Sequence, residues 1–204
     1  MSAVARLCLF NLVCLSSGAL RDPPIVDIPD QGMIVGKEIS PIRTQRILGY
    51  LGIPYAMPPE RFAPPDFDEL PSWDGVRNAT EFEAGCMQNK ENIMSEDEPF
   101  NHLLSDEDLP YSEDCLYLNV YVPYGPAPPE GFAVMVWIHP GNFMYGNPAL
   151  WNPYTIVYKQ RVIMVTIAYR LNIFGFFTTM DGEAPDHIRC VTSGLVWLRW
   201  SMVT

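Results

Sequence analysis

The three histidines of this 204-residue chain are the first candidates for proton-transfer chemistry. A serine nucleophile of the hydrolase type sits on a sharp strand-to-helix turn, in a Gly-x-Ser-x-Gly pattern. No serine here has glycine at both the second position before it and the second position after it. None of the three, His102, His139 and His187, has a serine and a carboxylate at a spacing that suggests a catalytic triad. We therefore predict no catalytic residue in the chain, and the sequence indicates neither a metal site nor a cofactor.

The cysteines indicate which compartment the chain enters. Residues 1–19 are predicted to be a secretory signal peptide, because Arg6 is the only early charge, residues 7–15 are mostly apolar, and Ala19 suits a cleavage site. A buried N-terminal helix is the alternative. We expect a protein of the secretory pathway that reaches the extracellular space, where thiols form disulfides.

Three cysteines follow residue 19. Cys86 and Cys115 are the natural pair, closing a loop of about 30 residues that restricts the unfolded chain by roughly 3–4 kcal/mol. Cys190 is left without a partner. Asn78 begins an Asn-Ala-Thr sequon, which we expect to carry an N-linked glycan in a secreted protein.

Charge and composition exclude two classes of protein. The chain has 13 Lys and Arg against 24 Asp and Glu, so its net charge is −11, which disfavours binding to nucleic acid. No apolar run approaches the roughly 18–20 residues of a membrane-spanning helix. Residues 91–158 contain acids but neither Lys nor Arg. This stretch is either a solvated acidic loop or an electronegative face for a basic partner.

The apolar patterns predict an α/β chain with a mixed sheet. Residues 25–39 alternate weakly and resemble a short hairpin, and residues 46–56 and 116–122 read as strands. Continuous apolar runs at 134–138 and 162–168 are typical of strands covered on both faces. Residues 151–158 are either a helical turn or a wrapped loop. The clustered prolines, 20 in all, argue against a helical bundle.

Several motifs together resemble the type-B carboxylesterase and cholinesterase family. Residues 51–56 (LGIPYA), a proline pair and Arg61-Phe62 are similar to its opening block, and 113–123 (EDCLYLNVYVP) fit its second signature in full. The resemblance covers roughly residues 25–185. It implies the N-terminal part of an α/β-hydrolase fold with an incomplete mixed sheet, and a family disulfide between Cys86 and Cys115.

The resemblance also places an oxyanion hole, the set of donors that stabilises negative charge on a carbonyl oxygen. Active relatives read His-Gly-Gly-Gly-Phe where this chain reads His139-Pro140-Gly141-Asn142-Phe143. By position, the donors are the N–H groups of Gly141 and Asn142. Because Pro140 has no N–H and the Asn142 side chain would occupy space kept for substrate, we expect the hole to be impaired. A harmless loop variation is the alternative.

The family's nucleophile, acid and histidine would all lie beyond Thr204. We expect residues 20–185 to form the N-terminal part of a carboxylesterase domain. We expect residues 186–204 to be a tail that does not match, which would come either from alternative splicing or from an incorrect gene model. The last core strand would then have an open edge, which predicts poor stability of the isolated chain.

Two functions remain for such a chain. The first prediction is a truncated, catalytically inactive, cholinesterase-like protein of the cell-adhesion or junction type, with an extracellular protein partner. Residues 139–143 (HPGNF), together with residues 170–185, are most similar to gliotactin, a non-catalytic adhesion protein of the plasma membrane. The alternative is the N-terminal fragment of a secreted carboxylic-ester hydrolase, and a third possibility is a non-functional translation product. The choline-binding branch is disfavoured because no Trp lies between Cys86 and Cys115.

Overall fold

The computed structural model describes residues 23–65, 69–89 and 110–178. The predicted signal peptide, His102, His187, Cys190 and the tail from 186 lie outside these ranges, as do most of the acids of the 91–158 stretch. No helix in the described part of the chain is long and apolar enough to cross a membrane.

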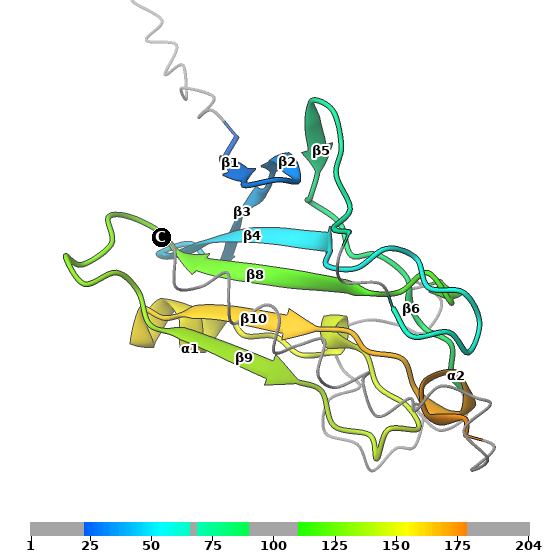
Figure 1. The fold of residues 1–204 in the computed structure, drawn as a ribbon. Coiled ribbons are helices and arrows are strands. Elements are labelled where there is room, and N and C mark those ends of the chain that lie inside the picture. Colours follow the sequence, from blue (N-terminus) through cyan, green and yellow to red (C-terminus); the bar gives the residue numbers. More distant parts are fainter. Residues whose placement is uncertain (1–22, 66–68, 90–109, 179–204) are drawn as a thin grey trace, which may run out of the picture.

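A five-stranded mixed sheet forms the centre of the molecule, in the order β3-β4-β8-β10-β9 (Figure 1). Its strands are β3 (Lys37–Ile42), β4 (Gln45–Pro54), β8 (Tyr117–Pro123), β9 (Val134–Ile138) and β10 (Ile163–Ile167). The pairs β3–β4, β4–β8 and β8–β10 are antiparallel, and β9 runs parallel to β10. The predicted mixed sheet is therefore confirmed.

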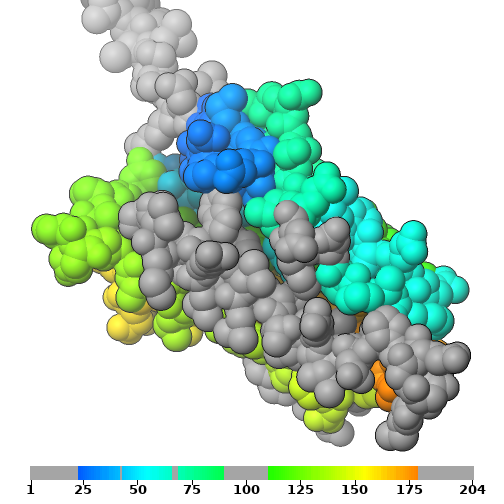
Figure 2. Space-filling view, in the orientation of Figure 1, coloured from blue at the N-terminus to red at the C-terminus, as the bar shows by residue number. Residues whose placement is uncertain are grey.

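Two smaller sheets flank the central one. The first contains β1 (Ile25–Ile28), β2 (Gly32–Val35) and β5 (Val76–Asn78), which Figure 2 shows as adjoining blue and green surfaces. The second joins β6 (Gly85–Cys86) to β7 (Tyr111–Ser112) in parallel. Three short helical segments complete the described structure, namely η2 (Pro148–Leu150), α1 (Tyr154–Gln160) and α2 (Asn172–Phe176).

The N-terminal hairpin is shorter than expected. Strands β1 and β2 pair antiparallel with Ile28 opposite Gly32, whereas Lys37 and Ile39 belong to β3 and pair with β4. Gly36 lies where the chain passes from one sheet to the other, and a side chain there would clash with the Gly49 carbonyl. The alternation of apolar and polar residues over 25–39 therefore runs through strands of two different sheets. Periodicity alone cannot show where one sheet ends and the next begins. Of the two alternatives for residues 151–158, the structure contains the helical one, because α1 begins at Tyr154 within this stretch.

The two continuous apolar runs behave differently. In β10 the residues from Met164 to Ile167 are buried, as predicted. In β9 the side chains of Met135, Val136 and Ile138 are exposed, so the expectation of a strand covered on both faces is wrong for this part of the chain. The reason is that β9 is the outer strand of the described sheet and pairs with β10 alone.

Each face of the central sheet has its own buried cluster, because side chains alternate along a strand. One cluster contains Tyr121, Met164 and Ile47, packed with Val157 of α1. The other contains Leu118, Val165 and Ile53, together with Cys115. The two signature segments, 51–56 and 113–123, thus meet in the core as β4 and β8.

Charged residues of the sequence motifs fix the irregular loops onto this core. Arg61 donates through Nε to both carboxylate oxygens of Glu113, at 2.9 and 3.1 Å. This hydrogen bond is the main reason why the pKa of Glu113 is lowered. Arg170 is buried, and its guanidinium donates to the Ala63 carbonyl at 2.7 Å. The proline-rich loop after β4 is therefore bound both to the segment before Cys115 and to the segment after β10.

A buried amide stabilises an irregularity in the sheet. The pairing of β4 with β8 shifts register between Tyr50 and Ile53, and Gly52 adopts a positive φ of 68° there. The side chain of Asn119 accepts from the Gly52 N–H at 3.0 Å and donates to the Thr166 hydroxyl at 3.0 Å. Asn119 therefore links β4, β8 and β10 at the point where the backbone ladder is interrupted.

We expect Asn119→Leu to lower the free energy of unfolding by about 2–4 kcal/mol, because it leaves the Gly52 N–H buried without a partner. Thr166→Val is the matched control, since it removes one bond and keeps the contact with Gly52, and it should cost about 1 kcal/mol. Urea denaturation of the two variants measures both effects. Equal losses in the two variants would contradict this role for Asn119.

Candidate oxyanion turn

The turn predicted to stabilise an oxyanion lies at the carboxyl ends of β9 and β10. Figure 1 shows β9 and β10 pointing toward the end of the molecule where β6 and α2 lie, with β8 pointing the opposite way. Ligand sites of α/β sheets are found at the carboxyl ends of parallel strands. The turn, residues 139–146, follows β9 directly at this end.

Left-handed backbone angles shape this turn. Gly141, Asn142 and Phe143 have φ values of 128°, 53° and 63°. The carbonyl of Gly141 accepts hydrogen bonds from the N–H groups of Met144 at 2.9 Å and Tyr145 at 3.2 Å. A Cβ on Gly141 would lie 1.8 Å from the Tyr145 carbonyl oxygen, so this position has no room for a side chain. Asn is among the residues that tolerate the left-handed region best, which suits it to position 142.

The predicted donors have no partner inside the described structure. The N–H groups of Gly141 and Asn142, and that of Phe143, donate to no other described residue. Successive N–H groups in such turns form concavities that attract anions. The Asn142 side chain is exposed. This arrangement leaves backbone donors available for a negatively charged oxygen.

His139 is part of the scaffold of the turn. It is buried, its ring stacks on that of Tyr169 with 4.3 Å between centroids, and its Nδ1–H donates to the Pro140 carbonyl at 2.9 Å. Burial lowers the pKa of His139 to about 4, so the imidazole is neutral near pH 7. The Tyr169 hydroxyl donates to the His139 carbonyl at 2.8 Å. These contacts make His139 part of the packing that holds the turn.

Two residues that sequence reasoning missed hold the turn in place. Tyr169 lies in the segment after β10, and Gln88 hydrogen-bonds the backbone of Gly146 through its side-chain amide. Asn172 adds a third contact, because its N–H donates to the Phe143 carbonyl at 2.7 Å. None of these pairings has a signal in the sequence, since the partners are far apart along the chain.

Three further predictions concern the disulfide, the glycosylation sequon and metal binding. The Cys86–Cys115 disulfide is present, as predicted, with a Cα–Cα distance of 5.0 Å, and it is consistent with the secretory pathway. Asn78 is exposed at the end of β5, and its glycosylation remains a prediction. Within the described ranges, no group of three or more His, Cys, Asp or Glu side chains could hold a metal ion.

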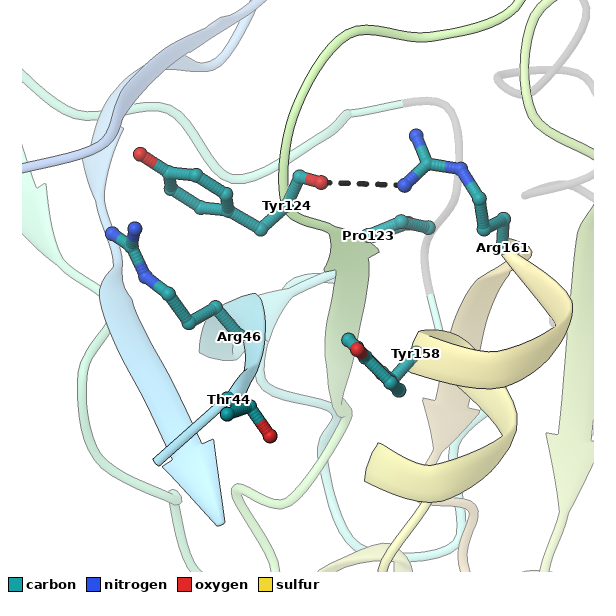
Figure 3. Close-up of a pocket in the computed structure, with 6 residues that line it drawn as sticks. All are labelled: Thr44, Arg46, Pro123, Tyr124, Tyr158 and Arg161. Carbon is teal, nitrogen blue, oxygen red and sulfur yellow. Dashed lines mark hydrogen bonds between the residues drawn. The ribbon is translucent and has the colours of Figure 1, made fainter. Parts of the chain in front are cut away.

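A pocket at the opposite end of the sheet is a poor candidate for the reaction site. It has a volume of about 140 Å³ and is lined by Thr44, Arg46, Pro123, Tyr124, Tyr158 and Arg161 (Figure 3). The charge of Arg46 is already paired with Glu38, and Arg161 donates to the carbonyls of Tyr124 and Pro126. Since β8 ends here beside the start of β10, the pocket lies away from the turn.

Comparison with known proteins agrees with the motifs. A model of the carboxylesterase family matches residues 22–188. The chain is 36% identical over 184 residues to carboxylesterase 1E of Mus musculus, covering 87% of this chain and 32% of that protein. For liver carboxylesterase 1 of Oryctolagus cuniculus the identity is 38% over 172 residues, with 82% and 30% covered. For cocaine esterase of the same species it is 42% over 141 residues, with 68% and 26% covered. The chain therefore spans about a third of the length of the curated relatives it matches.

These relatives overturn the prediction of a non-catalytic adhesion protein similar to gliotactin. Their names are those of esterases, with identities of 36–42% over most of this chain. The adhesion interpretation depended on two departures, Pro140 and Asn142, and on the stretch 170–185. Both departures lie in a turn whose donors at Gly141 and Asn142 have no partner among the described residues, so neither is a reason to exclude ester chemistry.

Stability should fall on acidification because His139 is buried in its neutral form. Its pKa is about 4 in the folded chain, against an ordinary value near 6.5, so the unfolded state binds the extra proton between these values. Above about pH 6.5 His139 does not lower the free energy of unfolding. As the pH falls from there toward 4, the free energy of unfolding should decrease by about 2–3 kcal/mol. His139→Gln keeps a donor and cannot be protonated. Urea denaturation at pH 7.5 and 4.5 should show a smaller loss in this variant, and equal losses would contradict the assignment.

Proposed function

Because this chain belongs to the carboxylesterase family, we propose that it forms the oxyanion-binding part of a carboxylic-ester hydrolase. The observation that carries the proposal is that, within the described part of the chain, the N–H groups of Gly141 and Asn142 have no partner and lie just after the carboxyl end of β9. In ester hydrolysis the carbonyl oxygen becomes negatively charged as the tetrahedral intermediate forms. Fixed N–H groups stabilise that charge without reorganisation.

The proposal requires a nucleophile from elsewhere. The 204 residues contain no Gly-x-Ser-x-Gly sequence, and His139 is buried, with its ring stacked on Tyr169 and its Nδ1–H on the Pro140 carbonyl, so it is held as part of the turn. We therefore propose that the serine, its histidine and its acid come from polypeptide outside this sequence, in a longer protein that contains it. The length of the relatives supports this, since the chain spans about a third of them.

The surroundings of the turn favour an ester with an apolar acyl or alcohol group. Phe143 and Met144 are about half exposed, at 49% and 50%, and Ile173 of α2 is 54% exposed. Phe143 also contacts Phe176, with ring centroids 5.1 Å apart. An apolar group beside the turn would cover these side chains, which is favourable at about 25 cal/mol per Å² of buried apolar surface. The disulfide and the exposed Asn78 sequon support a secreted, glycosylated enzyme.

The activity can be tested on the longest natural translation product that contains these residues. We expect hydrolysis of p-nitrophenyl butyrate and stoichiometric labelling by a fluorophosphonate, which reacts with an activated serine. Neither turnover nor label would contradict the proposal. Labelling without turnover would contradict only the role of the turn.

Two variants of the turn separate the backbone donors from the Asn142 side chain. Gly141→Ala forces the turn to move, because its Cβ would meet the Tyr145 carbonyl, and we expect kcat to fall by about 10²-fold or more. Asn142→Gly keeps both N–H groups and allows the same φ, so kcat should equal or exceed that of the unmodified protein. A Gly141→Ala variant with unchanged kcat would exclude this turn as the oxyanion hole.

A further inference from the structure

The side-chain amide of Gln88 behaves like a short piece of backbone beside the turn. Its Nε2 donates to the Gly146 carbonyl at 2.9 Å, and its Oε1 accepts from the Gly146 N–H at 2.7 Å. The same Nε2 also donates to the Cys86 carbonyl at 3.0 Å. One side chain thus satisfies both backbone groups of Gly146 and returns to the residue that forms the disulfide.

Gly146 is the position at which the turn must close. Its φ is 126°, and a Cβ there would lie 2.2 Å from Nδ1 of His139. The start of the turn is held by β9 and by the Tyr169 hydroxyl on the His139 carbonyl. Its far end is held by Gln88. The free donors of Gly141 and Asn142 lie between these two fixed points.

The disulfide gives Gln88 a rigid base. Cys115 is fully buried, and Tyr117, two residues further on, begins β8 of the central sheet. Cys86 lies in β6 and is bonded to Cys115. Asn172 adds to this base, because its Nδ2 donates to the Met87 carbonyl at 3.1 Å. A covalent and hydrogen-bonded path therefore runs from β8 through the disulfide to Gln88 and Gly146.

We propose that Gln88 is a positioning residue that couples the Cys86–Cys115 disulfide to the oxyanion turn. Its effect on turnover rests on the proposed function, whereas its effect on the turn does not. Donors to an oxyanion act only within narrow limits of distance, and a displacement of about 1 Å can cost about 100-fold in rate. Loss of Gln88 or of the disulfide would release the far end of the turn and move the donors away from the substrate carbonyl.

Gln88→Met tests the role with little change in side-chain volume. Gln31→Met is the matched control, since the Gln31 amide likewise donates to two carbonyls, but to those of Pro54 and Pro71, which are not part of the turn. In the ester-hydrolysing protein we expect kcat to fall at least tenfold for Gln88→Met, with KM within about twofold, as for loss of transition-state binding alone. Gln31→Met should leave kcat unchanged for folded protein. Equal kcat losses in the two variants, or no loss for Gln88→Met, would overturn the proposal.

Hydrogen exchange separates this inference from the proposed function, because it needs no activity. We expect faster exchange of peptides spanning 139–147 in Gln88→Met, and in the protein with Cys86→Ser and Cys115→Ser, but not in Gln31→Met. Combining Gln88→Met with the two Cys→Ser changes should accelerate exchange by less than the product of the separate factors, since both act on one path. Independent, multiplicative effects would refute the coupling. An inactive protein with the expected exchange pattern would refute only the proposed function.

Discussion

Backbone N–H groups can stabilise a negative oxygen only if the fold holds them in place without using them. Most N–H groups in a folded chain are consumed by secondary structure, and those left over usually lie in mobile loops. Around Gly141 and Asn142 the chain meets both demands, because the contacts that hold the turn use other groups: the carbonyls of Gly141, His139 and Phe143, and both backbone groups of Gly146. The other described elements hold in place the residues that make these contacts.

The frame reaches the turn from three separate parts of the sequence. Gln88 comes from the segment anchored by the disulfide, Tyr169 from the segment after β10 and Asn172 from the start of α2. Arg61 and Glu113 add stiffness further back by linking the proline-rich loop to the segment that carries Cys115. Residues of two family motifs, Arg61 and Glu113, thus support the segment that carries the disulfide and Gln88.

Sequence patterns predicted the strands better than their surroundings. The continuous apolar runs, the 113–123 signature and the cysteine pair each led to an element or bond that the structure contains. The exposure of Met135 and Ile138 was not predictable, because periodicity reports that a strand is apolar and does not report which neighbours cover it. The contact between Gln88 and Gly146 was equally hidden, since 58 positions separate the two residues and a glutamine carries no local signal of its partner.

The departures at Pro140 and Asn142 misled the functional interpretation because Pro140 is not one of the two donors, and because the Asn142 side chain was given more weight than its N–H. What matters at an oxyanion hole is the main chain. Pro140 lacks an N–H, yet its part in the turn is played by its carbonyl, which accepts from His139. Asn142 keeps its N–H and adopts a φ of 53°, an angle that asparagine accepts more readily than most residues. The N–H groups of Gly141 and Asn142 have no partner among the described residues, so a turn with Pro140 and Asn142 in place of glycines keeps the backbone donors that the proposed function requires.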